Sequence, residues 1–98
     1  MNIIKTQEDS TLNVALEGRL DTTTSPELEA ALSGALDGIK TLVFDFNKLV
    51  YISSAGLRVM LANQKVMNKQ GEMIIKNVCP DIMEVFEMTG FSDILTIQ

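Results

Sequence analysis

The chain has 98 residues, a hydrophobic content of 46% and a formal net charge of −5 at pH 7. This length supports a single core, so we expect one domain over residues 1–98. The acidic balance argues against nucleic acid and against an anionic membrane surface as partners, because both attract basic faces.

The content of reactive side chains excludes several kinds of catalytic site. There is no histidine and only one cysteine, Cys79. A Ser-His-Asp triad, a Cys-His dyad and a His- or thiolate-ligated zinc site are therefore excluded. Neither of the common glycine-rich phosphate-binding motifs occurs. We expect no catalytic residue, no metal and no cofactor, and a small α/β enzyme is the least favoured class of function.

The sequence also predicts the compartment. A single cysteine forms no intrachain disulfide, the first ten residues are too polar for a signal peptide, and no apolar run reaches the about 20 residues of a membrane span. These features predict a cytoplasmic protein.

The N-terminal residues predict a β-hairpin. Residues 2–5 form a short apolar start, and residues 11–18 alternate, with Leu12, Val14 and Leu16 on one face. This period of two is typical of a strand with one buried face. The polar residues between the two segments indicate a turn.

Residues 22–38 predict the first helix, with an apolar stripe that begins at Leu28. Ser25 is a good N-cap because Pro26 follows it at the first helical position, and Thr24 with Glu27 forms the competing capping box. Gly38 is the expected C-cap.

The rest of the chain alternates between strands and helices. We predict strands at 41–46, 72–78 and 93–97 and helices at 53–71 and 80–90. This order predicts an α/β fold: a mostly parallel sheet of four to five strands, with an antiparallel edge strand and three or more helices. The loops after residues 18 and 46 leave the same end of this sheet, where ligand sites tend to lie, so we expect them to be neighbours.

Three segments, in this order, resemble the STAS domains of the bacterial anti-sigma factor antagonist family. They are LEGRLDTTTSPEL, TLVFDFNKLVYISSAGLRVML and GEMIIKNVCPDIMEVFEMTGFSDIL, and together they cover nearly the whole chain. The family pattern has an Asp-Ser pair before Gly-Leu, and its serine is phosphorylated by a partner kinase. The resemblance places this phosphoacceptor at Ser54. Ser53 stands at the position of the family aspartate, and Asp21 matches an aspartate beside the serine.

The resemblance implies a partner-binding surface around Ser54. Its expected residues are Asp21, Thr22, Thr23, Ser53, Ser54, Ala55, Gly56, Leu57 and Arg58.

The residues themselves leave several alternatives open. Ser54 is either a helix cap or a phosphoacceptor, and Ser53 is the N-cap or a loop residue. Gly56 indicates close packing either inside the protein or against a partner backbone. Arg58 is a solvated residue or a phosphate clamp, and Asp45 is a loop-organising acceptor or a site residue.

The resemblance implies a regulatory protein that is not an enzyme. The unphosphorylated form would bind an anti-sigma factor serine kinase, phosphorylation at Ser54 would release it, and a PP2C-type phosphatase would reset it. The alternative is a non-phosphorylated STAS subunit of a lipid-transport ABC complex.

Overall fold

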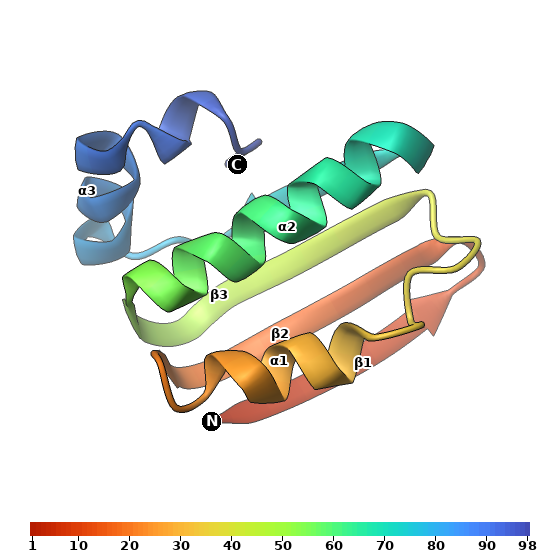
Figure 1. Ribbon diagram of the computed structural model, residues 1–98, viewed down its shortest axis with the longest axis horizontal. Coiled ribbons are helices and arrows are strands. Elements are labelled where there is room, and N and C mark those ends of the chain that lie inside the picture. Colours follow the sequence, from red (N-terminus) through yellow and green to blue (C-terminus); the bar gives the residue numbers. More distant parts are fainter.

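The computed structural model describes all 98 residues, and Figure 1 shows the arrangement of its elements. The elements in chain order are β1 (Asn2–Glu8), β2 (Thr11–Leu20), α1 (Ser25–Leu32), β3 (Thr41–Ile52), α2 (Ser54–Gln70), β4 (Glu72–Lys76), α3 (Pro80–Thr89) and a 3-10 turn, η1 (Phe91–Asp93).

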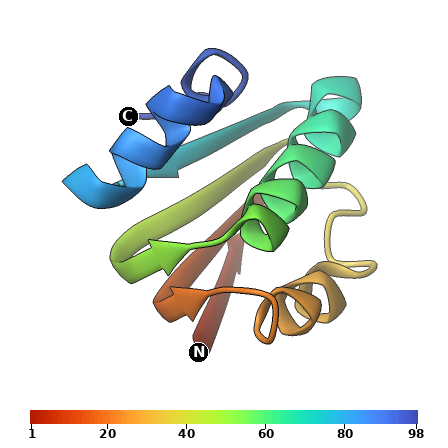
Figure 2. The ribbon, with the colours of Figure 1, turned by 60° about the vertical axis from the view of Figure 1, so that its left-hand side comes forward.

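The four strands form one mixed sheet in the order β1-β2-β3-β4. β1 pairs antiparallel with β2, and β2, β3 and β4 are parallel. The predicted α/β fold, its antiparallel edge strand and its three helices are confirmed. Because each parallel connection moves one strand further along the sheet, right-handed crossovers place the helices on one face, which Figures 1 and 2 show.

The core lies between this face and the helices. Alternate side chains of β2 and β3, including Val14 and Phe44, are fully buried there. α3 packs on the sheet through Phe86, whose ring centroid lies 6.4 Å from that of Phe46 in β3. The other face of the sheet carries half-buried side chains such as Asn13 and Val43.

β3 is six residues longer than the strand that we predicted at 41–46, since it continues to Ile52. Two register shifts against β2 explain the error, because each adds an unpaired residue to β3. As a result Phe46, Leu49 and Ile52 are buried at intervals of three. The period of two therefore ends at Phe46 in the sequence, although the strand does not.

The first helix is shorter than predicted and starts differently. α1 ends at Leu32 with Ser33 as its C-cap, so the predicted C-cap Gly38 lies in the following turns. Thr24 occupies the N-cap position, but its side chain makes no capping bond. Ser25 is the first helical residue, so its prediction as the N-cap was wrong, and the predicted capping box does not form.

The two C-terminal strands are also shorter than predicted. β4 ends at Lys76 because Asn77 has a positive φ of 60°. The strand predicted at 93–97 is reduced to a single parallel bridge between Ile75 and Ile97, since η1 occupies its start. α3 begins at Pro80 and ends before Gly90, whose φ of 82° is the expected left-handed cap.

None of the helices has the length and apolar character needed to span a membrane.

We predict that Phe86→Ala lowers the free energy of unfolding by about 3 to 5 kcal/mol, because it leaves a cavity between α3 and the sheet. Met88→Ala is the matched control on the same helix, since Met88 is 78% exposed, and its effect should stay within about 0.5 kcal/mol. Urea denaturation followed by circular dichroism measures both. Equal losses would show that α3 does not depend on this contact.

Candidate functional site

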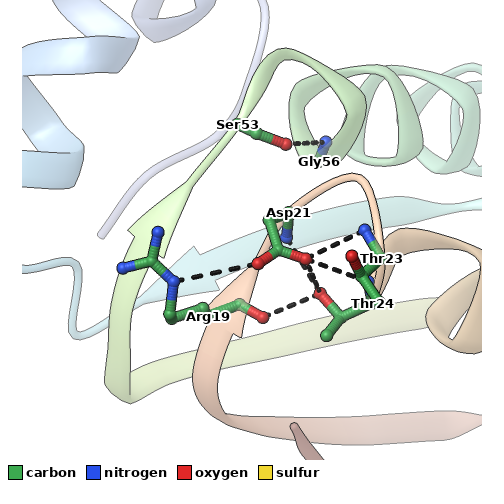
Figure 3. Close-up of polar contacts among 6 residues, drawn as sticks. All are labelled: Arg19, Asp21, Thr23, Thr24, Ser53 and Gly56. Atoms are coloured by element: carbon green, nitrogen blue, oxygen red, sulfur yellow. Dashed lines mark hydrogen bonds and ion pairs between the residues drawn. The ribbon is translucent and has the colours of Figure 1, made fainter.

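The two serines at the start of α2 have different roles. Ser53 is the N-cap, with extended backbone, and its Oγ accepts a hydrogen bond of 3.3 Å from the backbone N–H of Gly56 (Figure 3). Ser54 is the first residue of the helix, is exposed, and makes no side-chain hydrogen bond. The capping role therefore belongs to Ser53, which is one of its two alternatives, and not to Ser54, whose hydroxyl remains free.

The two loops predicted to be neighbours do meet at this end of the sheet. Leu20 and Ile52, the last residues of β2 and β3, are partners in the parallel register. The backbone N–H of Ser53 donates a 2.9 Å hydrogen bond to the carbonyl oxygen of Leu20. Asp21 directly follows Leu20, and Ser54 directly follows Ser53. This hydrogen bond therefore holds the start of the Asp21 loop beside the start of α2.

Asp21 organises its own loop through a ring of hydrogen bonds (Figure 3). Its Oδ1 accepts from the backbone N–H groups of Thr23 and Thr24, both at 3.0 Å. The Thr24 hydroxyl accepts from the Asp21 N–H and donates to the carbonyl of Arg19. This Asx-type turn leaves Thr22 and Thr23 exposed beside the start of α2.

The pKa of Asp21 lies below its ordinary value because the Thr24 N–H stabilises the carboxylate. The Thr23 N–H, the Thr24 hydroxyl and the charge of Arg19 act in the same direction, against desolvation. The carboxylate is therefore ionised at neutral pH, and the loop presents a fixed negative charge.

Gly56 is required by packing inside the protein. A Cβ atom at this position would lie 2.8 Å from Cγ1 of Ile52 and 2.9 Å from Cγ of Leu20. Leu57 is also buried, at 7% exposure. These two residues seat α2 on the strand ends, whereas Ser54 and Arg58 are exposed and Ala55 is half-buried.

Sequence reasoning missed Arg19 and Tyr51 as candidate site residues. The guanidinium carbon of Arg19 lies 4.1 Å from the centroid of the Tyr51 ring, and its Nε lies 3.8 Å from Oδ2 of Asp21. Tyr51 and Val50 are 40% and 64% exposed. Arginine and tyrosine are enriched among the residues that dominate binding energy at interfaces. The position of Arg19 two residues before Asp21 was the available signal for the arginine. Tyr51 gave no signal, because the strand predicted from the sequence ended at residue 46 and Tyr51 was assigned to a loop.

A groove of about 720 Å³ lies between α1 and α2 and begins at the candidate site. Thr22, Ala55 and Arg58 line it near the helix starts, and Glu29 lines it along α1. Ser25 also lines the groove, but its hydroxyl oxygen is buried and has no hydrogen-bond partner.

Asp45 is separate from the candidate site. Its Oδ1 accepts hydrogen bonds from the N–H of Asn47 at 3.0 Å and from Nδ2 of Asn77 at 2.9 Å. The Asn77 side chain, followed by the Asn47 N–H and the charge of Lys76, holds the pKa of Asp45 below its ordinary value despite desolvation. Asp45 therefore stabilises the turn after β4. Of its two alternatives, the structure favours the loop-organising acceptor.

The His, Cys, Asp and Glu side chains form no group of three or more that could hold a metal ion.

Comparison with known proteins decides the family. The protein-family model of the STAS domain matches residues 2–98 of this chain. This chain belongs to the STAS domain family.

Two relatives match this STAS domain over almost its whole length. It is 36% identical to BtrV, a putative anti-sigma factor antagonist of Bordetella bronchiseptica, over 99% of this chain and 85% of the relative. It is 31% identical to the anti-sigma-B factor antagonist of Staphylococcus aureus, over 100% of this chain and 93% of the relative.

Solved structures share the fold of this STAS domain. An anti-sigma factor antagonist from Mycobacterium paratuberculosis superposes with a TM-score of 0.88 at 22% identity, over 98% of this chain and 83% of the other. The unphosphorylated form of SpoIIAA gives a TM-score of 0.79 at 21% identity, over 99% and 87%. SpoIIAA of Bacillus in its phosphorylated form gives 0.77 at 21% identity, over 99% and 91%.

We predict that Asp21 titrates below the ordinary aspartate pKa of about 3.9. Because the folded pKa is depressed, the carboxylate stabilises the loop above the unfolded pKa, and this contribution is lost as pH falls through the folded pKa. The amide proton shifts of Thr23 and Thr24, followed by NMR from pH 6 to 2, should report this transition. A midpoint at or above about 3.9 would contradict the hydrogen-bonded turn.

We predict that Gly56→Ala destabilises the fold, although alanine is the better helix former by about 1 kcal/mol. The contacts with Leu20 and Ile52 add an overpacking cost of about 1 to 3 kcal/mol. Chemical denaturation measures the difference. In a Leu20→Ala background the same change should cost less, since part of the colliding side chain is gone. A stabilised single variant would show that the glycine is not needed for packing.

Proposed function

We propose that this STAS domain is an anti-sigma factor antagonist controlled by phosphorylation of Ser54. The observation that carries the proposal is the free, exposed hydroxyl of Ser54 on the first turn of α2, where Ser53 alone supplies the cap. The two relatives named as anti-sigma factor antagonists support the regulatory class.

The partner of the unphosphorylated form is an anti-sigma factor with serine-kinase activity. Its binding surface on this chain consists of the exposed residues at the two strand ends, with Ser54 near the centre and Asp21 and Thr22 beside it. Arg19 and Tyr51 extend this surface, because their side chains are already held together. Binding there sequesters the anti-sigma factor and frees the sigma factor.

Phosphorylation requires only a hydroxyl from this chain. The Ser54 oxygen forms a bond to the γ-phosphorus of ATP, the bond to ADP breaks, and a base of the kinase takes the hydroxyl proton. The kinase binds ATP and Mg²⁺. A PP2C-type phosphatase hydrolyses the phosphoserine and restores the hydroxyl.

The phosphate acts on the surface rather than on the fold. It adds about −1.5 to −2 charges at a helix N-terminus, where the helix dipole favours an anion. Asp21, which is ionised at neutral pH, lies across the Ser53–Leu20 hydrogen bond from this position. Two adjacent anionic groups then replace one carboxylate and a neutral hydroxyl, so a partner that fits the neutral surface is released.

Ser53 favours a second candidate function. The family aspartate is absent at this position, and its charge is therefore missing from the site. A non-phosphorylated STAS subunit of a lipid-transport ABC complex would not need that charge. Recovery of an ATPase subunit instead of a kinase in a pulldown would favour this alternative.

We predict that the cognate kinase and ATP add one phosphate to the wild-type chain and none to Ser54→Ala, as measured by intact-mass spectrometry. Ser92→Ala, in the turn after α3, is the control and should still accept one phosphate. The phosphorylated protein should keep its circular dichroism spectrum and lose affinity for the kinase. An unmodified wild-type chain would overturn the proposal, and a collapsed spectrum would overturn its surface mechanism.

A further inference from the structure

Arg58 is a cation without a partner, one helical turn after Ser54. It is exposed on α2 and forms no ion pair within 4.0 Å and no hydrogen bond. The other arginine of the chain, Arg19, is held by both Asp21 and Tyr51. The guanidinium of Arg58 is therefore free to bind an anion that arrives at the start of α2.

The surroundings of Arg58 supply no competing anion from its own helix. α2 carries Arg58, Lys65 and Lys69 and contains no aspartate or glutamate. Glu29 of α1 lines the same groove, but its carboxylate lies beyond ion-pair distance of the guanidinium. Arg58 thus lines the groove beside Ser54 as an exposed positive charge without an ion-pair partner.

We propose that Arg58 binds the phosphate of phosphorylated Ser54 and holds it along the first turns of α2. The proposal deepens the function above and rests on the same modification. Residues at i and i+4 lie on the same side of a helix, and an acid placed N-terminal to a base is the favourable order. A guanidinium also binds two phosphate oxygens at once, which an ammonium does not match.

The clamp adds to the other two features of this helix start. The first N–H groups of α2 and the helix dipole already favour an anion, and Asp21 repels it from the neighbouring loop. Arg58 draws the phosphate away from Asp21 and toward the groove between the helices. The phosphorylated form then has a fixed anionic group, rather than a mobile one, at the centre of the partner surface.

The test uses phosphoserine incorporated at position 54 during translation, so that no kinase is needed. The second ionisation of the phosphate is followed by phosphorus NMR in the wild-type background, in Arg58→Gln, in Arg58→Lys and in Lys65→Gln. Lys65→Gln is the matched control, because it removes the same charge from an exposed site further along α2. All four proteins are also melted with and without the phosphate.

We expect Arg58→Gln to raise the phosphate pKa by about 0.3, from the size of i, i+4 ion pairs. Arg58→Lys should give a smaller rise, and Lys65→Gln should match the wild type. The gain in melting temperature on phosphorylation should shrink in Arg58→Gln alone. Equal pKa values in Arg58→Gln and Lys65→Gln would overturn the clamp. Failure of a kinase to modify Ser54 would refute the proposed function and leave this result unaffected.

Discussion

The hydrogen bond from the Ser53 N–H to the Leu20 carbonyl fixes the geometry of the whole site. It extends the β2–β3 pairing to the last residue of both strands, so the two loops leave the sheet side by side. The same junction brings the start of α2 so close to Leu20 and Ile52 that only glycine fits at position 56. The loops are thereby positioned by the sheet, and neither depends on its own flexibility to reach the other.

Ser53, which stands where the family pattern has an aspartate, removes a charge from the site but still supplies a helix cap. Aspartate and serine are both good N-caps, and the Ser53 hydroxyl makes the capping bond to Gly56. α2 therefore starts directly after this capping residue, and Ser54 lies on its first turn. What remains of the negative charge is Asp21, whose carboxylate is held ionised by the turn that it organises.

The order of the elements could be predicted from the sequence, because alternation and helical stripes are local signals. The pairing of the two loops followed from that order, because the carboxyl ends of parallel strands meet at one edge of a sheet. The full length of β3 could not, since two register shifts against β2 move Leu49 and Ile52 out of the period of two. The contact between Arg19 and Tyr51 depends on that hidden extension, so it was missed as well. The end of α1 at Leu32 was missed because Leu36 is also buried and continues the apolar stripe.

The proposed phosphate at Ser54 would meet a site whose interior has little room to respond. Gly56 and Leu57 are buried against the strand ends, so the first turn of α2 cannot move without opening the core. Ser53 keeps the cap whatever the state of Ser54, because their hydroxyls have separate roles. In this proposal the added charge acts through two groups that are already at the surface: the half-buried Asp21, which repels it, and the exposed Arg58, which attracts it. On a rigid scaffold these two opposite charges would decide where the proposed phosphate lies, and so which part of the surface the proposed partner loses.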